Sequence, residues 1–421
     1  MNIFTKKTRR IFVTVILVLV FCFSVALNIF LIKGGKNISK YNIAAAEKII
    51  GLQLTSHERK LMLPNLSKNL ARYKKMREVK LDNSISPALI FNPIIPGIKI
   101  EQKKFFSIEE LPKIAAPTYI EDMAFQPIPV LAQLLKTRQI TSVELTTMFI
   151  NRLEKFGPRL ECTITLAKDL ALKQAQKADR EIASGNYRGL LHGIPWGAKD
   201  LLATKGIKTT WGAAPYKDQI IDINATVVEK LEESGAVLIA KISLGALAMG
   251  DVWYGGKTRN PWNISKGSSG SSAGPAAAVA AGLMPFAIGS ETWGSIVSPS
   301  TTCGVTGLRP TFGRVSRYGA MALSWTMDKI GPICRNAEDC AIVLNSIYGP
   351  DDKDLSVQNI PFSYDSKIEL TSLKIGYLKN DFESSYSFKH TDSLALKKIK
   401  ELGVKLIPIE LPNFPYRSIS F

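Results

Sequence analysis

The sequence predicts an α/β fold in which a β-sheet is layered by α-helices. The stretch "ATVVEKLEESGAVLIAKISL" reads as an amphipathic helix, a stop at Gly235 and a buried strand over 237–242. The stretch "GLMPFAIGSETWGS" reads as a strand over 284–288 that ends in a glycine-rich loop. Strands that alternate with helices are typical of sheets covered by helices. A composition of 46% apolar and 21% charged residues is that of a globular protein.

The N-terminus pairs a basic tail with an apolar run. The tail, 1–10, ends in "KKTRR", and the 22 residues of 11–32 carry no charge. That run is long enough to cross a hydrocarbon core of about 30 Å. It continues past "FSVALN" without a good cleavage site, which favours a retained transmembrane anchor; secretion after signal cleavage is the alternative. The basic tail predicts a cytoplasmic N-terminus and places the rest of the chain outside the cytoplasm.

Residues 33–118 are interpreted as a membrane-proximal extension in which no chemistry can be recognised. The stretch 55–81 has a helical spacing of apolar and charged residues, and the proline-rich 86–97 reads as extended. Lys and Arg outnumber Asp and Glu by 54 to 36, giving a net charge of +18. Because no basic and aromatic nucleic-acid motif is present, we expect anionic membrane lipid as the partner and no nucleic acid.

The globular domain is expected over 119–421. Thr141 and Glu144 form the capping box that starts a helix. Apolar residues then follow at helical spacing and predict one buried helix face: Leu145, Phe149, Leu153 and Phe156.

The stretch "KGSSGSSAGPAAAVAAG", 266–282, resembles a flexible linker in composition only. It runs without a spacer into Ala276–Ala281, where helix propensity is near its maximum. Glycine and serine ahead of such a run are typical of a tight turn that feeds a capped helix. We therefore expect a bent loop here.

No metal or organic cofactor is expected. The cysteines are five and scattered, without the CxxC or His-rich spacing of a zinc site or a disulfide framework. They are Cys22, Cys162, Cys303, Cys334 and Cys340.

Histidine-based catalysis has little support. The chain holds three histidines, His57, His192 and His390, and none lies in a recognisable catalytic motif. The residues 270–274 do fit G-x-S-x-G, with Ser272 as the nucleophile. That elbow should follow an apolar strand, which the preceding "NPWNISKGSS" does not predict, so the match is a weak alternative.

A serine can instead be activated by a neutral lysine, provided that burial lowers the pKa of the amine. Lys199 follows the apolar run "IPWGA" and is a candidate. Two loops bring serines: the Gly/Ser stretch above, and "GSETWGSIVSP", in which Ser295 follows Gly294.

Four motifs occur in order and at fitting separations. They are "GIPWGAKD", "GSSAGPAAAVAAG", "GSETWGS" and "CGVTGLRPTFGRVSRYGAM". Together they resemble the amidase signature family of serine hydrolases, which includes the A subunits of tRNA-dependent amidotransferases. The resemblance covers roughly residues 125–360. It implies a mixed central β-sheet layered by α-helices.

The resemblance also implies a site and an activity. Ser295 is the implied nucleophile, Ser271 the bridging serine after a cis peptide bond, and Lys199 the base. Linear carbon–nitrogen bonds of a small-molecule amide, other than peptide bonds, are the implied target. The implied oxyanion hole consists of the backbone N–H groups of Thr292, Trp293, Gly294 and Ser295.

The chain departs from the family's pattern in two ways. Glu291 replaces the usual aspartate and Trp293 replaces a glycine, so we expect a tryptophan that lines or crowds the acyl pocket. Val297 and Ser298 also differ from the usual residues, whereas Cys303 and Arg309 are interpreted as structural. The family continues beyond the position of Phe421, and we expect the C-terminal part to be missing.

Two alternatives stay open. One is an inactive or truncated homologue that acts as a binding protein, and the other is a glutaminase like the A subunits of glutaminyl- or asparaginyl-tRNA amidotransferases. The sequence does not identify the amide, and it leaves a homo-oligomer open.

Overall fold

The computed structural model describes residues 38–81, 85 and 88–413. The basic tail and the predicted anchor, 11–32, lie outside the described residues. None of the helices within the described ranges combines the length and the apolarity that crossing a bilayer requires.

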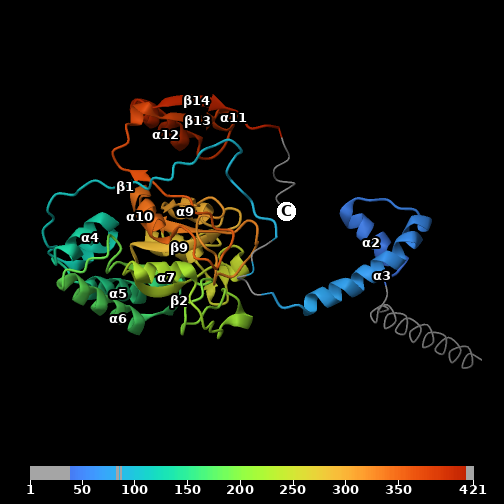
Figure 1. Cartoon of the computed structure of the whole chain (residues 1–421), viewed down its shortest axis with the longest axis horizontal. Coiled ribbons are helices and arrows are strands. Elements are labelled where there is room, and N and C mark those ends of the chain that lie inside the picture. Colours follow the sequence, from blue (N-terminus) through green and yellow to red (C-terminus); the bar gives the residue numbers. More distant parts are fainter. Residues whose placement is uncertain (1–37, 82–84, 86–87, 414–421) are drawn as a thin grey trace, which may run out of the picture. The chain divides into compact units, whose positions relative to one another are not determined.

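Contacts between residues divide the chain into two units, 1–82 and 83–421. In the first unit, helices α2 (Lys40–Ile50) and α3 (Ser56–Glu78) each begin at a capping box. Arg59 of α3 binds the carboxylate of Glu47 of α2, with both donor–acceptor distances 2.8 Å. The helical spacing read in 55–81 is thus confirmed (Figure 1).

A six-stranded mixed sheet forms the centre of the second unit. Strand β3 is parallel to both β4 and β9, and the other neighbours are antiparallel. In spatial order the strands are β10 (Thr306–Gly307), β11 (Lys329–Cys334), β9 (Phe286–Glu291), β3 (Pro195–Lys199), β4 (Val237–Ile242) and β2 (Thr163–Leu166).

The central strands are buried on both faces, as a sheet covered by helices requires. The predicted strand over 237–242 is confirmed as β4. The strand predicted over 284–288 begins at Phe286 and continues to Glu291 instead. Its pairing with β11 explains the shift, because that ladder runs from Phe286 opposite Cys334 to Glu291 opposite Lys329.

Helices pack against this sheet. Helix α5 begins at the predicted capping box, and Leu145, Phe149 and Leu153 are buried. Phe156 is 37% exposed, so its assignment to the buried face was wrong; the guanidinium of Arg152 covers its ring at 5.3 Å. The helices are α4 (Ile128–Lys136), α5 (Ser142–Leu160), α6 (Lys168–Ala183), α7 (Thr226–Glu233), α8 (Ala273–Ala280), α9 (Val297–Cys303) and α10 (Ala337–Ile347).

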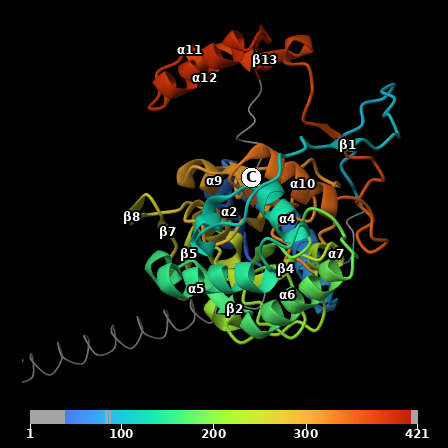
Figure 2. The same cartoon turned by 90° about the vertical axis from the view of Figure 1, so that its left-hand side faces the viewer.

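Smaller elements complete the second unit (Figures 1 and 2). A parallel pair, β13 (Lys374–Leu378) and β14 (Lys405–Ile409), is joined through α11 (Lys379–Glu383) and α12 (Lys389–Glu401). The short strands are β1 (Phe106–Ser107) with β12 (Tyr364–Asp365), β5 (Val252–Trp253) with β6 (Gly256–Lys257), and β7 (Arg259–Asn260) with β8 (Asn263–Gly267). Single-turn or short 3-10 helices cover Ile120–Phe125, Ala214–Tyr216, Ala246–Ala248 and Leu370–Ser372.

The topology gathers three chain segments at one edge of the sheet. Strands β3 and β9 are parallel neighbours, with Ala198 opposite Ile288, so their carboxyl ends meet. The loop before α8 supplies the third segment, because Ser272 N donates to the carbonyl oxygen of Ser295 just beyond β9. This edge carries the candidate site.

Candidate active site

Lys199 is the last residue of β3, and its side chain is fully buried. Its Nζ lies 2.9 Å from Ser271 Oγ and 3.0 Å from Ser272 Oγ. It lies 3.0 Å from the hydroxyl and 3.2 Å from the carbonyl oxygen of Ser290. All four of these hydrogen-bond partners are uncharged oxygen atoms.

This environment changes the protonation of Lys199. Burial lowers the pKa of its amine to about 7, while the charges of Asp328 and Glu291 oppose the shift. An ammonium is penalised by loss of water, and hydroxyl groups compensate for it less than a carboxylate does. Near neutral pH a large fraction of Lys199 is therefore the neutral amine.

The Gly/Ser stretch is a bent loop that leads into α8, as predicted. The peptide bond between Gly270 and Ser271 is cis, as the resemblance implies. A Cβ on Gly270 would lie 1.8 Å from the carbonyl oxygen of Gly250, so only glycine fits there. Ser271 is 1% exposed, whereas Ser268 and Ser269 bond elsewhere, Ser269 to the hydroxyl of Ser298.

Ser272 is a second hydroxyl partner of the lysine that the sequence did not predict in this role. Its Oγ donates to the carbonyl oxygen of Ser290 at 3.1 Å and accepts from Ser290 N at 3.2 Å. Gly289 permits this approach, because a Cβ there would lie 2.8 Å from Ser272 Oγ. Ser290 was missed because it lies within a stretch read only as a glycine-rich loop.

The elbow hypothesis gains a strand but no histidine. Strand β8 does precede the loop, contrary to the sequence interpretation, although it is mostly exposed and not apolar. His192 is buried, with Nε2 3.1 Å from Glu181 Oε2 and Nδ1 accepting from Arg188 N at 3.1 Å. Burial lowers the pKa of His192. Both ring nitrogens are thus used away from Ser272.

Ser295 lies in the loop between β9 and α9, which we call the oxyanion loop, 292–295. Its carbonyl oxygen accepts from Ser272 N at 3.0 Å, which ties it to the lysine's partners. The carbonyl of Thr292 accepts from Lys329 Nζ at 2.8 Å, and that of Gly294 accepts from Ser298 N at 2.8 Å. In a planar trans peptide the N–H points opposite to the carbonyl. The N–H groups of Trp293 and Ser295 therefore point away from these partners.

The two departures from the family's pattern have visible consequences. Glu291 Oε2 accepts from Ile296 N at 2.8 Å and from Val297 N at 3.0 Å, which fixes the start of α9. Its other oxygen lies 3.6 Å from Arg309 Nε, giving that arginine an ion pair beyond packing. Trp293 is 55% exposed, so its indole lies at the surface beside the oxyanion loop.

A buried ion pair adjoins the site. Lys241 Nζ lies 2.9 Å from Asp200 Oδ1, and both side chains are fully buried. Oδ1 makes this ion pair and no further hydrogen bond within the described residues. Asp200 Oδ2 accepts from Thr210 N at 2.7 Å, and Lys241 donates to Thr209 Oγ1 at 2.7 Å. Burial lowers the pKa of Lys241, and Asp200 opposes that shift.

A narrow hollow lies beside Lys199. Ser290, a partner of that lysine, and Asp328 line it together with apolar side chains. The apolar lining includes Leu201, Ala320, Met321, Trp325 and Ile330. Within the described ranges, no cluster of His, Cys, Asp and Glu is suited to hold a metal ion.

A buried lysine joined to serines at the edge of a mixed α/β sheet is thus the chemical centre of this molecule. Residues 144–419 match the family described as Amidase. The chain belongs to the amidase signature family of enzymes that act on carbon–nitrogen bonds.

Two groups of relatives illustrate this membership. The glutamyl-tRNA(Gln) amidotransferase A-type chain of Thermoanaerobacter pseudethanolicus is 39% identical over 68% of this chain and 60% of its own length. Its counterpart in Acinetobacter baumannii is 41% identical over 67% and 59%. The peptide amidase of Stenotrophomonas maltophilia superimposes with a TM-score of 0.65 at 34% identity, covering 71% of this chain and 65% of its own. The chain thus spans less than two thirds of the length of these relatives.

Proposed function

We propose that this protein is a serine amidase that hydrolyses a linear carboxylic amide through an acyl-enzyme on Ser295. The observation that carries the proposal is Lys199, buried against hydroxyl oxygens with Ser271 Oγ at 2.9 Å. Burial that lowers the pKa of the amine to about 7 supplies a base at neutral pH without histidine.

The hydrogen bonds give the proton transfer a direction. A neutral amine has two N–H donors and one lone pair. The hydroxyl proton of Ser272 is directed to the carbonyl of Ser290, so Ser272 accepts one N–H of Lys199. Ser290 accepts the other. The lone pair is then left to accept the hydroxyl proton of Ser271.

The reaction follows from this arrangement. Lys199 takes the proton of Ser271, which takes that of Ser295, and Ser295 Oγ forms a bond to the amide carbon. Backbone N–H groups of the oxyanion loop stabilise the negative oxygen; one such donor is typically worth about 3 to 4 kcal/mol. The carbon–nitrogen bond breaks as Ser271 returns a proton to the amine. Water then attacks the acyl-enzyme and releases the acid.

We also propose that residues 11–32 anchor the protein in a membrane, with the catalytic domain outside the cytoplasm. The uncharged run and the basic tail before it support this. Alkaline carbonate extraction tests the anchor: the full chain should stay with membranes. Protease added to intact cells tests the side, since it should degrade the catalytic domain.

A second candidate is a glutaminase like that of the amidotransferase A subunits. Identities of 39 to 41% to those proteins favour it. Ammonia release from free glutamine, compared with release from uncharged short amides, separates the two candidates. A clear preference for glutamine would favour the glutaminase.

The deciding experiment is fluorophosphonate labelling of the full chain, with the adduct located by mass spectrometry. An adduct on Ser295, absent in Ser295→Ala and weakened in Lys199→Ala, supports the amidase. An adduct on Ser272 would instead support the elbow hypothesis. Folded protein without any adduct would overturn the enzyme proposal and favour a binding protein.

A further inference from the structure

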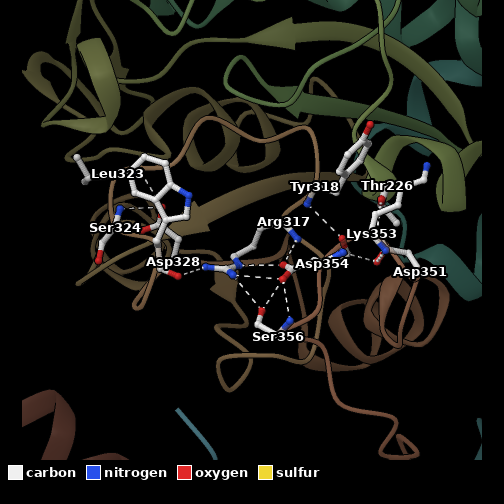
Figure 3. A network of polar contacts seen from close by, with 12 residues as sticks. Thr226, Arg317, Tyr318, Leu323, Ser324, Asp328, Asp351, Lys353, Asp354 and Ser356 are labelled. Carbon is white, nitrogen blue, oxygen red and sulfur yellow. Dashed lines mark hydrogen bonds and ion pairs between the residues drawn. The ribbon is translucent and has the colours of Figure 1, made fainter. Parts of the chain in front are cut away.

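Asp328 directly precedes β11 and joins three segments of the chain. Its Oδ1 accepts from Thr292 Oγ1 at 2.5 Å. Its Oδ2 accepts from Leu323 N at 2.7 Å and Ser324 N at 3.0 Å (Figure 3). Thr292 is the first residue of the oxyanion loop. One carboxylate therefore ties that loop to the turn 323–328.

The turn is itself anchored. Arg317 Nη1 donates to the carbonyl oxygen of Trp325, within the turn. The Nε of Arg317 and its backbone N donate to Asp354 Oδ2 at 3.0 and 2.9 Å. Asp354 is buried, and Ser356 caps its other oxygen (Figure 3). The turn that holds Asp328 is thus tied to the 351–356 loop.

The next residue holds the same threonine from its backbone side. Lys329 Nζ donates to the carbonyl oxygen of Thr292 at 2.8 Å. The side chain and the carbonyl of Thr292 are therefore both fixed, by two consecutive residues. Because the carbonyl sets the direction of the following N–H, this also orients the Trp293 donor of the oxyanion loop.

From these contacts we infer that Asp328 is a positioning residue, which holds the oxyanion loop in the geometry that Ser295 needs. The inference rests on the proposed amidase function. A carboxylate that accepts three hydrogen bonds at 2.5 to 3.0 Å is a rigid bracket, and donors must be fixed before charge develops on the substrate oxygen. Asp328 touches neither Ser271 nor Ser295 through any described hydrogen bond, so it acts through Thr292.

The carboxylate has a second, electrostatic consequence. Asp328 and Glu291 are the acids whose charges favour protonation of Lys199. The other charged groups on this side are the cations Lys329 and Arg309, of which Arg309 pairs with Glu291. Removing the charge of Asp328 should therefore shift the acidic limb of the pH–rate profile to lower pH, which a purely structural role would not do.

The test compares three full-chain variants. Thr292→Val and Asp328→Asn both disturb the bracket and should slow fluorophosphonate labelling of Ser295 roughly 10- to 100-fold, as misplaced catalytic groups do. Thr292→Ser keeps the hydroxyl and should label at nearly the wild-type rate. Amide hydrogen exchange of the peptide 286–300 should be faster in the first two variants only.

A matched control uses the same network. Thr226 Oγ1 donates to Asp351 Oδ2 at 2.5 Å, a threonine–aspartate bond like that of Thr292 but away from the oxyanion loop (Figure 3). Thr226→Val should reduce stability and leave labelling unchanged. Wild-type labelling rates and exchange in Thr292→Val and Asp328→Asn would overturn the inference. If the wild type itself is not labelled, the proposed function fails, and hydrogen exchange alone then decides whether Asp328 holds the loop.

Discussion

Two lysines on adjacent strands, Lys199 of β3 and Lys241 of β4, are both fully buried. Lys241 faces the carboxylate of Asp200 at 2.9 Å. Lys199 faces only uncharged oxygens, those of Ser271, Ser272 and Ser290. Burial lowers the pKa of both amines, but an adjacent carboxylate opposes the shift directly only at Lys241.

The difference shows how one fold uses the same residue type in two ways. An ion pair keeps a buried lysine charged and makes it a structural tie. Hydroxyl partners leave a buried lysine free to lose its proton and make it a base. The following experiments are expected to separate the two lysines.

The largest effect should come from removing the base. Lys199→Met should slow fluorophosphonate labelling of Ser295 by about a thousandfold, the scale of general-base catalysis. Lys241→Met has no base to remove and should label within about tenfold of wild type once folded. Second-order labelling rates measure both. Equal losses in the two variants would contradict the distinction.

Stability should show the reverse order. Lys241→Met leaves the buried Asp200 carboxylate unpaired and should lower the free energy of unfolding by about 3 to 5 kcal/mol. The double variant Lys241→Met with Asp200→Asn removes both charges and should recover part of that loss. Urea denaturation followed by circular dichroism measures it. A double variant that is less stable than the single one would refute this account.

The pH dependence sharpens the comparison further. Because Lys199 acts as the neutral amine, and burial lowers its pKa to about 7, labelling should rise with pH up to that value and then level off. Below it the rate should fall about tenfold per pH unit, since a tenfold change in the neutral fraction accompanies each unit. Rates between pH 5 and 9 test this. A profile that is flat between pH 5 and 7 would rule out Lys199 as the base.

The smallest effects should separate the partners of Lys199. Ser272→Ala removes an acceptor and the hydroxyl that satisfies Ser290, and should slow labelling about tenfold, since a lost hydrogen bond typically costs about 1 kcal/mol or slightly more. Ser290→Ala keeps the carbonyl acceptor at 3.2 Å and should cost only a fewfold. A Ser290→Ala loss as large as that of Ser272→Ala would show that the Ser290 hydroxyl, not its carbonyl, orients the amine.

Sequence reasoning reached the local features of this molecule better than its long-range contacts. The helix start at Thr141, the strand over 237–242 and the bent loop before α8 follow from short patterns, and the structure has them. Lys199 was a candidate because apolar residues precede it, and its burial is confirmed. Its contact with Ser271 was implied only by the family resemblance.

Contacts between distant segments could not be read in advance. Ser290 reaches Lys199 across 91 positions, and Asp328 reaches Thr292 across 36. Periodicity shows which face of an element is apolar, but not which loops meet at the end of a sheet. Phe156 failed for a related reason, because an apolar ring on a predicted core face is instead covered by an arginine.

The pleat of the sheet decides which lysine meets the serines. Trp196 lies opposite Leu238, but Gly197 lies opposite Ala240, so Ile239 is an extra residue in β4. Beyond it, Lys241 lies opposite Ala198 and therefore on the other face from Lys199. Without that residue the two amines would stand side by side on one face. A single bulged isoleucine thus separates the two lysines.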